Sequence, residues 1–233
     1  RVDSEFKMNF NPKIVTDGLV VCLDAADKKS YSGSGDTWYD RSSNGHNGAL
    51  ENDPTFSTDA GGCLDFDGVD EYVSVPENST FVTAQTWGLW FLVDSIPSAS
   101  SFTSIFQHSD TWNSAGGISM QFIYGNFTWA WGRSWGGCCQ ISQSELSTGT
   151  WYHVVGTSDG TTDSDGCKLY MNGELKDTGT ADQIPDDDDE ITIGKGNGGT
   201  MNGRIANFSI YSKELSAAEI TQNYNAMRGR FGI

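Results

Sequence analysis

The chain has 233 residues, and its 31 acidic side chains outnumber its 14 Lys and Arg, which gives a formal net charge of −17 at pH 7. That charge argues against a nucleic-acid partner, because binding to a phosphate backbone depends on clustered cations. No run of 18 apolar residues occurs, so we expect no insertion into a membrane. The 28 glycines and the 8 Trp, 8 Tyr and 12 Phe are typical of one large β-domain, in which glycines mark turns and aromatic rings fill the space between sheets.

Residues 1–16 are expected to form an extended arm, and residues 17–233 the domain itself. The arm is mostly polar, but Phe6, Met8, Phe10 and Ile14 are apolar and fall at even positions. In an extended chain this alternation puts the four side chains on one face, which could add to the edge of a neighbouring sheet. The alternative is a frayed terminus without a partner.

An oxygen-rich loop follows the apolar run Gly18–Ala26. Asp40 and Asn44, together with the backbone carbonyls of residues 41–47, offer the hard oxygen ligands that Ca²⁺ prefers. The acidic composition of the chain also suits a bound cation. We therefore treat Asp40 and Asn44 as a candidate Ca²⁺ site. The alternative is that both side chains cap turns through their own backbone, as Asp and Asn commonly do.

The segment 122–135 is rich in aromatic residues. Ile123, Phe127, Trp129 and Trp131 share one parity, so on a single regular strand they would line one face. This alternation is typical of a half-buried strand, and it predicts that Trp129 and Trp131 lie in the core of the domain.

Trp112 and Trp135 lie in glycine-containing, loop-like sequence beside this strand, where they are harder to bury. An exposed indole can stack on a sugar ring or anchor a protein interface, so both are candidate residues for binding a glycan or a partner. Phe231 is a third candidate. It lies in the C-terminal segment Met227–Ile233, which concentrates two cations and bulky apolar groups on an otherwise acidic chain.

The clearest local pattern in the sequence is a hairpin. Val154–Thr157 and Lys168–Met171 are apolar or β-branched runs, and Gly, Asp, Ser and Thr dominate the stretch between them. Asn172-Gly173 is a residue pair that favours a two-residue type I′ turn, so a third strand is expected to return from Glu174.

A short helix is expected over about residues 216–227. Ser216 is placed as its N-cap, and Glu219, three residues later, completes a capping box. Leu215 and Ile220 are placed as a hydrophobic staple. A short helix after a long series of strands predicts a β-sandwich with a terminal appendage rather than an α/β protein.

The five cysteines leave one thiol over under any full set of disulfides; they are Cys22, Cys63, Cys138, Cys139 and Cys167. Their spacing matches no zinc template. We expect reduced thiols that pack as small apolar groups. One bridge, from Cys167 to Cys138 or to Cys139, is the alternative.

Several phrases resemble laminin G-like domains of the concanavalin A-like lectin/glucanase superfamily. Trp151–Val155 with Lys168–Gly173 resembles their signature hairpin, W-x-H-V-V…K-L-Y-x-N-G. Trp38–Gly48 is similar to their W-x-D-x-S-G-N-G-N-x-G loop, with Ser43 in place of a usual glycine, and Leu64–Val73 is similar to their F-D-G-x-D-D-Y hairpin. The resemblance implies an all-β fold: a two-sheet antiparallel jelly-roll sandwich with a short C-terminal helix.

The resemblance also bears on metal binding and catalysis. Met201–Ile205 and Phe208–Tyr211 resemble the closing strands of the family, where many relatives complete a Ca²⁺ site with an acidic residue; here Ala206 and Asn207 replace the acids. Glucanases of the superfamily carry Glu-x-Asp-x-Glu on one strand, so that alternate carboxylates enter the cleft. No glutamate of this chain lies in that pattern, so we expect no enzymatic activity.

Leu23–Tyr31 and Asn223–Ile233 look most like copies of the domain in structural proteins of tailed bacteriophages. The first functional hypothesis is therefore a non-catalytic structural module of a virion, a capsid-decoration or fibre-associated protein that docks on other virion proteins or on copies of itself. The alternative is a carbohydrate-binding lectin domain whose partners are cell-surface glycans. A glycoside hydrolase is the third hypothesis, and it lacks the expected carboxylates.

Overall fold

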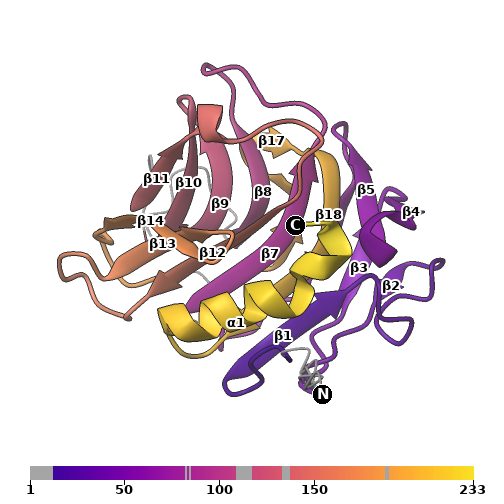
Figure 1. The fold of residues 1–233 in the computed structure, drawn as a ribbon, viewed down its shortest axis with the longest axis horizontal. Helices are drawn as coiled ribbons and strands as arrows, with labels where there is room; N and C mark the ends of the chain where they lie inside the picture. Colours follow the sequence, from indigo (N-terminus) through magenta and orange to yellow (C-terminus); the bar gives the residue numbers. More distant parts are fainter. Residues whose placement is uncertain (1–12, 82, 84, 109–116, 133–136, 187–188) are drawn as a thin grey trace, which may run out of the picture.

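A computed structural model describes residues 13–81, 83, 85–108, 117–132, 137–186 and 189–233. Two antiparallel sheets face each other across an aromatic core, and helix α1 (Ala217–Met227) crosses the outer face of one sheet (Figure 1). The expected fold class, an all-β two-sheet antiparallel jelly-roll sandwich with a short C-terminal helix, is confirmed. No helix of this described part is long and apolar enough to cross a membrane.

The first sheet has eight strands among the described residues. Its central strand β18 (Asn202–Tyr211) pairs along one side with β7 (Thr86–Val93). On the other side β5 (Cys63–Asp67) pairs with the first half of β18 and β1 (Leu19–Asp24) with the second half. The order across the sheet is β14, β13, β12, β7, β18, β5 and β4, of which the remaining bounds are Glu174–Gly179 for β14, Cys167–Met171 for β13, Tyr152–Ser158 for β12 and Thr55–Ser57 for β4.

The second sheet also has eight strands in the described part of the chain. In order across the sheet they are β11 (Cys139–Ser142), β10 (Asn126–Trp131), β9 (Ile118–Ile123), β8 (Thr103–His108), β15 (Ile191–Ile193), β6 (Tyr72–Val75), β3 (Gly48–Glu51) and β2 (Thr37–Trp38). A small hairpin of β16 (Lys195–Gly196) and β17 (Gly199–Thr200) lies beside β8. Single 3-10 turns lie at Asp59–Gly61, Gln143–Glu145 and Arg228–Phe231.

Aromatic side chains from both sheets meet in the core. Trp87 of the first sheet stacks on Phe106 of the second, with ring centroids 5.4 Å apart and planes 7° from parallel. Trp129 and Trp131 are buried, as the sequence predicts, and the Trp129 Nε1–H donates to the Thr157 carbonyl in the facing sheet at 3.1 Å. Gly156 permits this approach, since a Cβ at that position would lie 2.1 Å from the Trp129 ring.

The signature hairpin and the helix cap form as the sequence predicts. β12 and β13 pair antiparallel, and Asn172 and Gly173 have φ of 54° and 81°, the left-handed values that a type I′ turn requires before β14. At the N-terminus of α1 the Ser216 hydroxyl accepts from the Glu219 N–H, and the Glu219 carboxylate accepts from the Ser216 N–H. Both motifs use contacts between residues close in sequence, which explains their predictability.

The interpretation of Leu64–Val73 as a hairpin is wrong. β5 belongs to the first sheet and β6 to the second, so residues 68–71 carry the chain from one sheet to the other. Gly68 has φ of 80°, and the Asp67 carboxylate accepts from the Val69 N–H at 2.8 Å, which fixes a sharp bend. The bend looks like a hairpin turn in sequence, but β18 and β15 offer the pairing edges instead.

The expectation that segment 122–135 begins with a single strand is also wrong. The chain reverses at Tyr124 and Gly125, whose φ values are 51° and 80°, so β9 and β10 form a hairpin. Phe122 therefore pairs with Phe127 and shares its inward face, whereas Ile123 lies on the opposite face. Tyrosine is uncommon at positive φ, so the sequence carries a weak signal for this turn.

The chain before β1 packs on the helix. The Val15 N–H donates to the Asn223 side chain at 2.7 Å, and the Val15 carbonyl accepts from the Tyr211 hydroxyl at 3.1 Å. The Gln222 amide donates to the Lys13 carbonyl at 2.7 Å. Residues 13–16, which were assigned to the arm, are thus attached to their own sandwich; residues 1–12 lie outside the described part.

All five cysteines are free and buried. Burial raises the pKa of the Cys22 thiol to about 12 and that of the Cys63 thiol to about 11. A hydrogen bond with Cys138, together with burial, raises the pKa of the Cys167 thiol. Thiols with raised pKa values are poor nucleophiles, because the thiolate is the reactive form.

Candidate functional site

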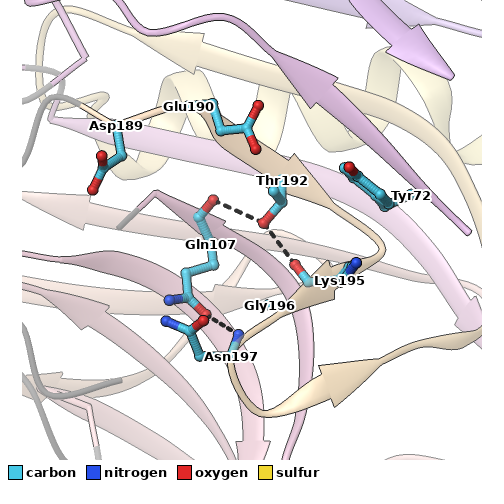
Figure 2. Close-up of a pocket in the computed structure, with 8 residues that line it drawn as sticks. All are labelled: Tyr72, Gln107, Asp189, Glu190, Thr192, Lys195, Gly196 and Asn197. Carbon is cyan, nitrogen blue, oxygen red and sulfur yellow. Dashed lines mark hydrogen bonds between the residues drawn. The ribbon is translucent and has the colours of Figure 1, made fainter. Parts of the chain in front are cut away.

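A cavity of about 390 Å³ opens on the outer face of the second sheet. This volume falls within the range of about 300–1,000 Å³ that is usual for small-molecule sites. Eight residues line it, as Figure 2 shows: Tyr72, Gln107, Asp189, Glu190, Thr192, Lys195, Gly196 and Asn197. They come from β6, β8 and β15, from the segment before β15 and from the hairpin that begins with β16.

Strand alternation directs a row of polar side chains outward at this site. The neighbours of Thr192 in β15, Ile191 and Ile193, are fully buried in the core, so Thr192 faces the other way. In the register of the sheet Thr192 lies opposite Ser74 of β6 on one side and opposite Gln107 of β8 on the other. Three adjacent strands therefore present a hydroxyl, a hydroxyl and an amide side by side.

Hydrogen bonds hold the floor of the cavity in place. The Thr192 hydroxyl donates to the Lys195 carbonyl at 2.8 Å, and the Asn197 N–H donates to Gln107 Oε1 at 2.8 Å (Figure 2). The Ser74 hydroxyl donates to a carboxylate oxygen of Glu190. Because these bonds join separate elements, the polar groups are ordered before any ligand arrives.

Gly196 brings the β16 hairpin close to the sheet. A Cβ at this position would lie 2.4 Å from Gln107 Oε1 and 2.4 Å from Ser104 Oγ. The Ser104 hydroxyl is fully buried there and makes no hydrogen bond. A side chain at residue 196 would therefore displace Gln107 and deform the floor of the cavity.

Charge and aromatic surface meet at one wall. The Lys195 ammonium lies 4.4 Å from the centroid of the Tyr72 ring, a cation–π distance. Burial, with Glu51 and Glu190 nearby, raises the pKa of the Tyr72 hydroxyl, so this group stays a neutral donor at physiological pH. In Figure 2, Asp189 and Tyr72 lie on opposite sides, with Gln107, Glu190 and Thr192 between them.

Other cavities offer less chemistry. One of about 370 Å³ borders Asn44 and His46, and its remaining lining of Thr, Ser, Gly, Leu and Val contains no carboxylate. Another, of about 210 Å³ beside Asp67 and Asn202, has no aromatic ring among its lining residues. The cavity beside Tyr72 combines a ring, amides, a hydroxyl and charged groups, so it is the candidate site.

Asp40 is anchored within its own loop. Its Oδ1 accepts from the N–H groups of Cys22 and Ser42, at 2.9 and 2.8 Å. Its Oδ2 accepts from the Ser42 hydroxyl at 2.6 Å and from the N–H groups of Gly45 and His46 at 3.1 Å each. A carboxylate has about four lone-pair sites, and these five donors occupy them. This arrangement does not fit a Ca²⁺ ion on Asp40 and favours the turn-forming alternative.

Asn44 completes the same anchor. Its amide nitrogen donates to the carbonyls of Leu19 and Val20, at 3.3 and 2.9 Å, and to the Ser42 hydroxyl at 3.0 Å. These bonds tie the loop to the edge of β1. Within the described residues, no group of three or more His, Cys, Asp or Glu is arranged to hold a metal ion.

Of the three candidate binding residues predicted from the sequence, Trp112 and Trp135 lie outside the described residues. Phe231 packs within the domain. Its ring stacks on Trp90 of β7 with centroids 3.9 Å apart and planes 8° from parallel, and the Trp151 ring lies 5.0 Å away. The Phe231 ring thus attaches the C-terminal segment to the outer face of the first sheet.

Arg230 fixes the same segment by charge. Its Nη1 donates to both carboxylate oxygens of Asp24, at 2.8 and 2.9 Å. Its Nε donates to the Ala60 carbonyl at 2.9 Å and its Nη2 to the Gly62 carbonyl at 3.1 Å. The guanidinium of this basic tail therefore pairs with a carboxylate of the same chain.

His153 lies under this segment, with its ring 5.0 Å from Trp90 and 6.0 Å from Tyr224. Burial lowers the pKa of His153 to about 3. The unfolded chain therefore takes up a proton near pH 6.5 that the folded chain binds only near pH 3, so stability is lost as the pH falls through this window. We expect a loss of about 2 kcal/mol between neutral pH and pH 5 from this residue.

Urea unfolding of wild type and His153→Phe between pH 7.5 and 5 measures this contribution. Over this pH range, the free energy of unfolding of His153→Phe should fall by about 2 kcal/mol less than that of wild type. His46→Phe, a change in a half-exposed loop residue, serves as the control. Equal slopes for wild type and His153→Phe would contradict the assignment.

Sequence reasoning missed most of the cavity. Tyr72, Gln107 and Thr192 are the outward positions of strands that alternate with buried Val73, Phe106 and Ile193, so period-two alternation was the available signal. Asp189 and Glu190, the last two residues of the acidic run 186–190, also line the cavity, and Glu190 is exposed.

Comparisons with known proteins agree with this architecture. A family model described as the concanavalin A-like lectin/glucanases superfamily matches residues 67–221. No curated protein sequence matches the chain.

Among solved structures, Trypanosoma rangeli sialidase in complex with sialic acid is similar, with 15% identity and a TM-score of 0.64 over 91% of this chain and 33% of the sialidase. The chain thus spans about a third of that enzyme's length. Domain 4 of an extracellular arabinanase from Geobacillus stearothermophilus, in complex with arabinotriose, has 18% identity and a TM-score of 0.62 over 88% of this chain and 98% of the domain. The binding domain of botulinum neurotoxin serotype D has 20% identity and a TM-score of 0.62 over 90% of this chain and 52% of that chain. At these identities the likeness extends to the fold alone.

Proposed function

Because the chain belongs to the concanavalin A-like lectin/glucanases superfamily, we propose that it is a carbohydrate-binding domain whose ligand occupies the cavity beside Tyr72. The observation that carries the proposal is the preordered polar row Ser74, Thr192 and Gln107, placed next to the Tyr72 ring. The arabinotriose complex of the arabinanase domain, which is similar over almost its whole length, supports a sugar as the class of ligand.

The lining suits a sugar because a sugar has two kinds of surface. Its hydroxyls pair with amides, hydroxyls and carboxylates, which Gln107, Thr192 and Glu190 supply. Its C–H faces are apolar and can pack against an aromatic ring with a polar edge, such as that of Tyr72. Since the floor is already hydrogen-bonded, little side-chain ordering is needed on binding.

We also propose that binding occurs without hydrolysis. Glycoside hydrolases place two carboxyl groups on either side of the scissile bond, about 5–9.5 Å apart. In this cavity both carboxylates, Asp189 and Glu190, come from consecutive residues of one segment, and Glu190 already accepts a hydrogen bond from Ser74. The glucanase pattern Glu-x-Asp-x-Glu is missing from the sequence.

We expect Tyr72→Ala and Gln107→Ala each to weaken glycan binding at least tenfold, which equals about 1.4 kcal/mol. The first change removes the ring and the second removes the amide that the Asn197 N–H holds in place. Glycan-array screening followed by titration calorimetry on the best ligand measures the effect, with circular dichroism to check the fold.

Tyr39→Ala is the matched control, because Tyr39 is also a tyrosine near the surface but lies outside the cavity. It should bind as wild type does. Binding by both cavity variants at wild-type affinity would place the ligand elsewhere on the domain, and a wild-type protein that retains no glycan would contradict the function.

The virion hypothesis rests on the phage-like phrases and on the acidic surface. The described parts of both terminal segments that were expected to reach other virion proteins, residues 13–16 and Arg230–Phe231, contact their own sandwich. A glycan-binding domain carried on a particle would satisfy both hypotheses. Detection of the chain on purified virions by immunolabelling would support the particle role.

A further inference from the structure

We propose that the cavity beside Tyr72 selects neutral or cationic sugars and rejects sugars that carry a carboxylate. This inference rests on the proposed function and names the class of ligand for the same site. It follows from the balance of charges around the cavity and from the kind of hydrogen-bonding group that lines it.

Acidic groups outnumber basic ones at the cavity. Asp189 and Glu190 both line it, and they end a run of five consecutive acids at residues 186–190. Glu51 of β3 lies opposite Tyr72 in the register of the same sheet, which adds a third carboxylate beside the cavity. Lys195 is the single cation among the lining residues, and its ammonium lies over the Tyr72 ring.

The wider field of the protein has the same sign. With a formal net charge of −17, the chain surrounds the cavity with a negative potential. Interactions between charges are screened over about 8 Å at physiological ionic strength, so a carboxylate bound in the cavity would still be repelled by the neighbouring carboxylates. Binding of an anionic sugar therefore carries an electrostatic free-energy cost that binding of a neutral sugar does not.

The hydrogen-bonding chemistry points the same way. Ionised carboxylates such as Glu190 and Asp189 only accept hydrogen bonds, so they pair with donors. The hydroxyls of a neutral sugar and the ammonium of an amino sugar are donors, whereas a sugar carboxylate is a further acceptor. Gln107 Oε1 is likewise an acceptor, and it already accepts from the Asn197 N–H.

Pairs of oligosaccharides with the same backbone and different charge test the proposal directly. Trigalacturonic acid is compared with its methyl ester, and the glucosamine trimer with its N-acetylated form, alongside neutral arabinotriose. Titration at low and high salt gives the affinities. If the first pair binds, we expect the methyl ester to bind at least tenfold more tightly than trigalacturonic acid. If the second pair binds, we expect the glucosamine trimer to bind as tightly as its N-acetylated form. Added salt should reduce any preference that charge produces.

Charge variants assign the effect to the cavity. The double variant Asp189→Asn with Glu190→Gln should bring the affinities for trigalacturonic acid and its ester at least threefold closer together. Asp163→Asn also makes the net charge less negative, but Asp163 lies on the loop between β12 and β13 of the other sheet. This control should leave the ratio of the affinities for the acid and its ester unchanged. Lys195→Gln should widen the ratio.

The possible outcomes distinguish charge selection from carbohydrate binding itself. Tighter binding of trigalacturonic acid than of its ester would overturn the charge selection and leave carbohydrate binding intact. A wild-type protein that binds no member of the panel and no glycan of the array would overturn both. An unchanged ratio in the double variant would show that the selecting charges lie outside this cavity.

Discussion

Deletion of residues 228–233 is expected to lower the free energy of unfolding by about 4 kcal/mol, which combines the loss of a packed aromatic ring with the loss of a hydrogen-bonded ion pair. Removing Phe231 uncovers Trp90, which is fully buried and stacks on Phe231 at 3.9 Å. Removing Arg230 takes away the charged partner of the Asp24 carboxylate, which then accepts only from the Ala26 N–H among the bonds described, and it removes the guanidinium donors to the carbonyls of Ala60 and Gly62. For a chain of this size the loss equals a fall of about 8–16 °C in melting temperature.

Differential scanning calorimetry measures this effect, and deletion of Gly232 and Ile233 alone is the control. That shorter deletion keeps Arg230 and Phe231 and removes two exposed residues, so it should melt within about 2 °C of wild type. Phe231→Leu, a milder change, should lie between the two. Equal melting temperatures for the longer deletion and wild type would show that the segment is not held to the sheet, and would return it to the expected role of docking on another protein.

Asp40→Ala is expected to destabilise the protein by about 3 kcal/mol, because hydrogen bonds to a charged group contribute about 1.5–3 kcal/mol and the donors left behind include backbone N–H groups. The carboxylate joins the N–H of Cys22 in β1 to those of Gly45 and His46 in the following loop. Its loss should release the loop from the strand. Urea unfolding gives the free energy, and hydrogen exchange at residues 42–47 shows the local opening.

Asp36→Ala is the matched control for this change. Asp36 lies on the preceding loop, is exposed, and its side chain accepts only from the neighbouring Thr37 hydroxyl among the bonds described. We expect a change within about 0.5 kcal/mol. A chelator should leave the melting temperature of wild type unchanged. A fall on chelation that Asp40→Ala abolishes would instead establish the Ca²⁺ site that the sequence suggested.

The two expected results concern features that the sequence located but assigned to other roles. Asp40 and Asn44 were recognised as a compact polar loop, and Phe231 and its neighbouring cations as an unusual tail. Residue type alone does not distinguish a metal ligand from a turn anchor. The same carboxylate can coordinate a cation or accept hydrogen bonds from N–H and O–H groups, and Asp40 accepts from five such donors. The tail was a candidate for binding a glycan or a partner, and its Arg230 pairs with Asp24 of the same chain.

What the sequence alone determined was set by interactions between residues close in the chain. The alternation of Trp129 and Trp131 placed them in the core, Asn172-Gly173 set a hairpin turn, and Ser216 with Glu219 capped the helix. These patterns depend on turn chemistry and strand periodicity, which a short window of residues contains. The resemblance to known domains then fixed the class of sandwich, and the family match agrees with it.

Only the tertiary structure decided which sheet each strand joins and which distant groups meet. The bend after Asp67 is local, but the choice between a hairpin and a crossing to the other sheet depends on the edges that β18 and β15 offer. The Ser74 to Glu190 bond in the cavity joins residues 116 apart, and the Arg230 to Asp24 pair joins residues 206 apart. Such contacts follow from the register and stacking of whole sheets, so no local pattern encodes them, and the site became visible only when three strands lay side by side.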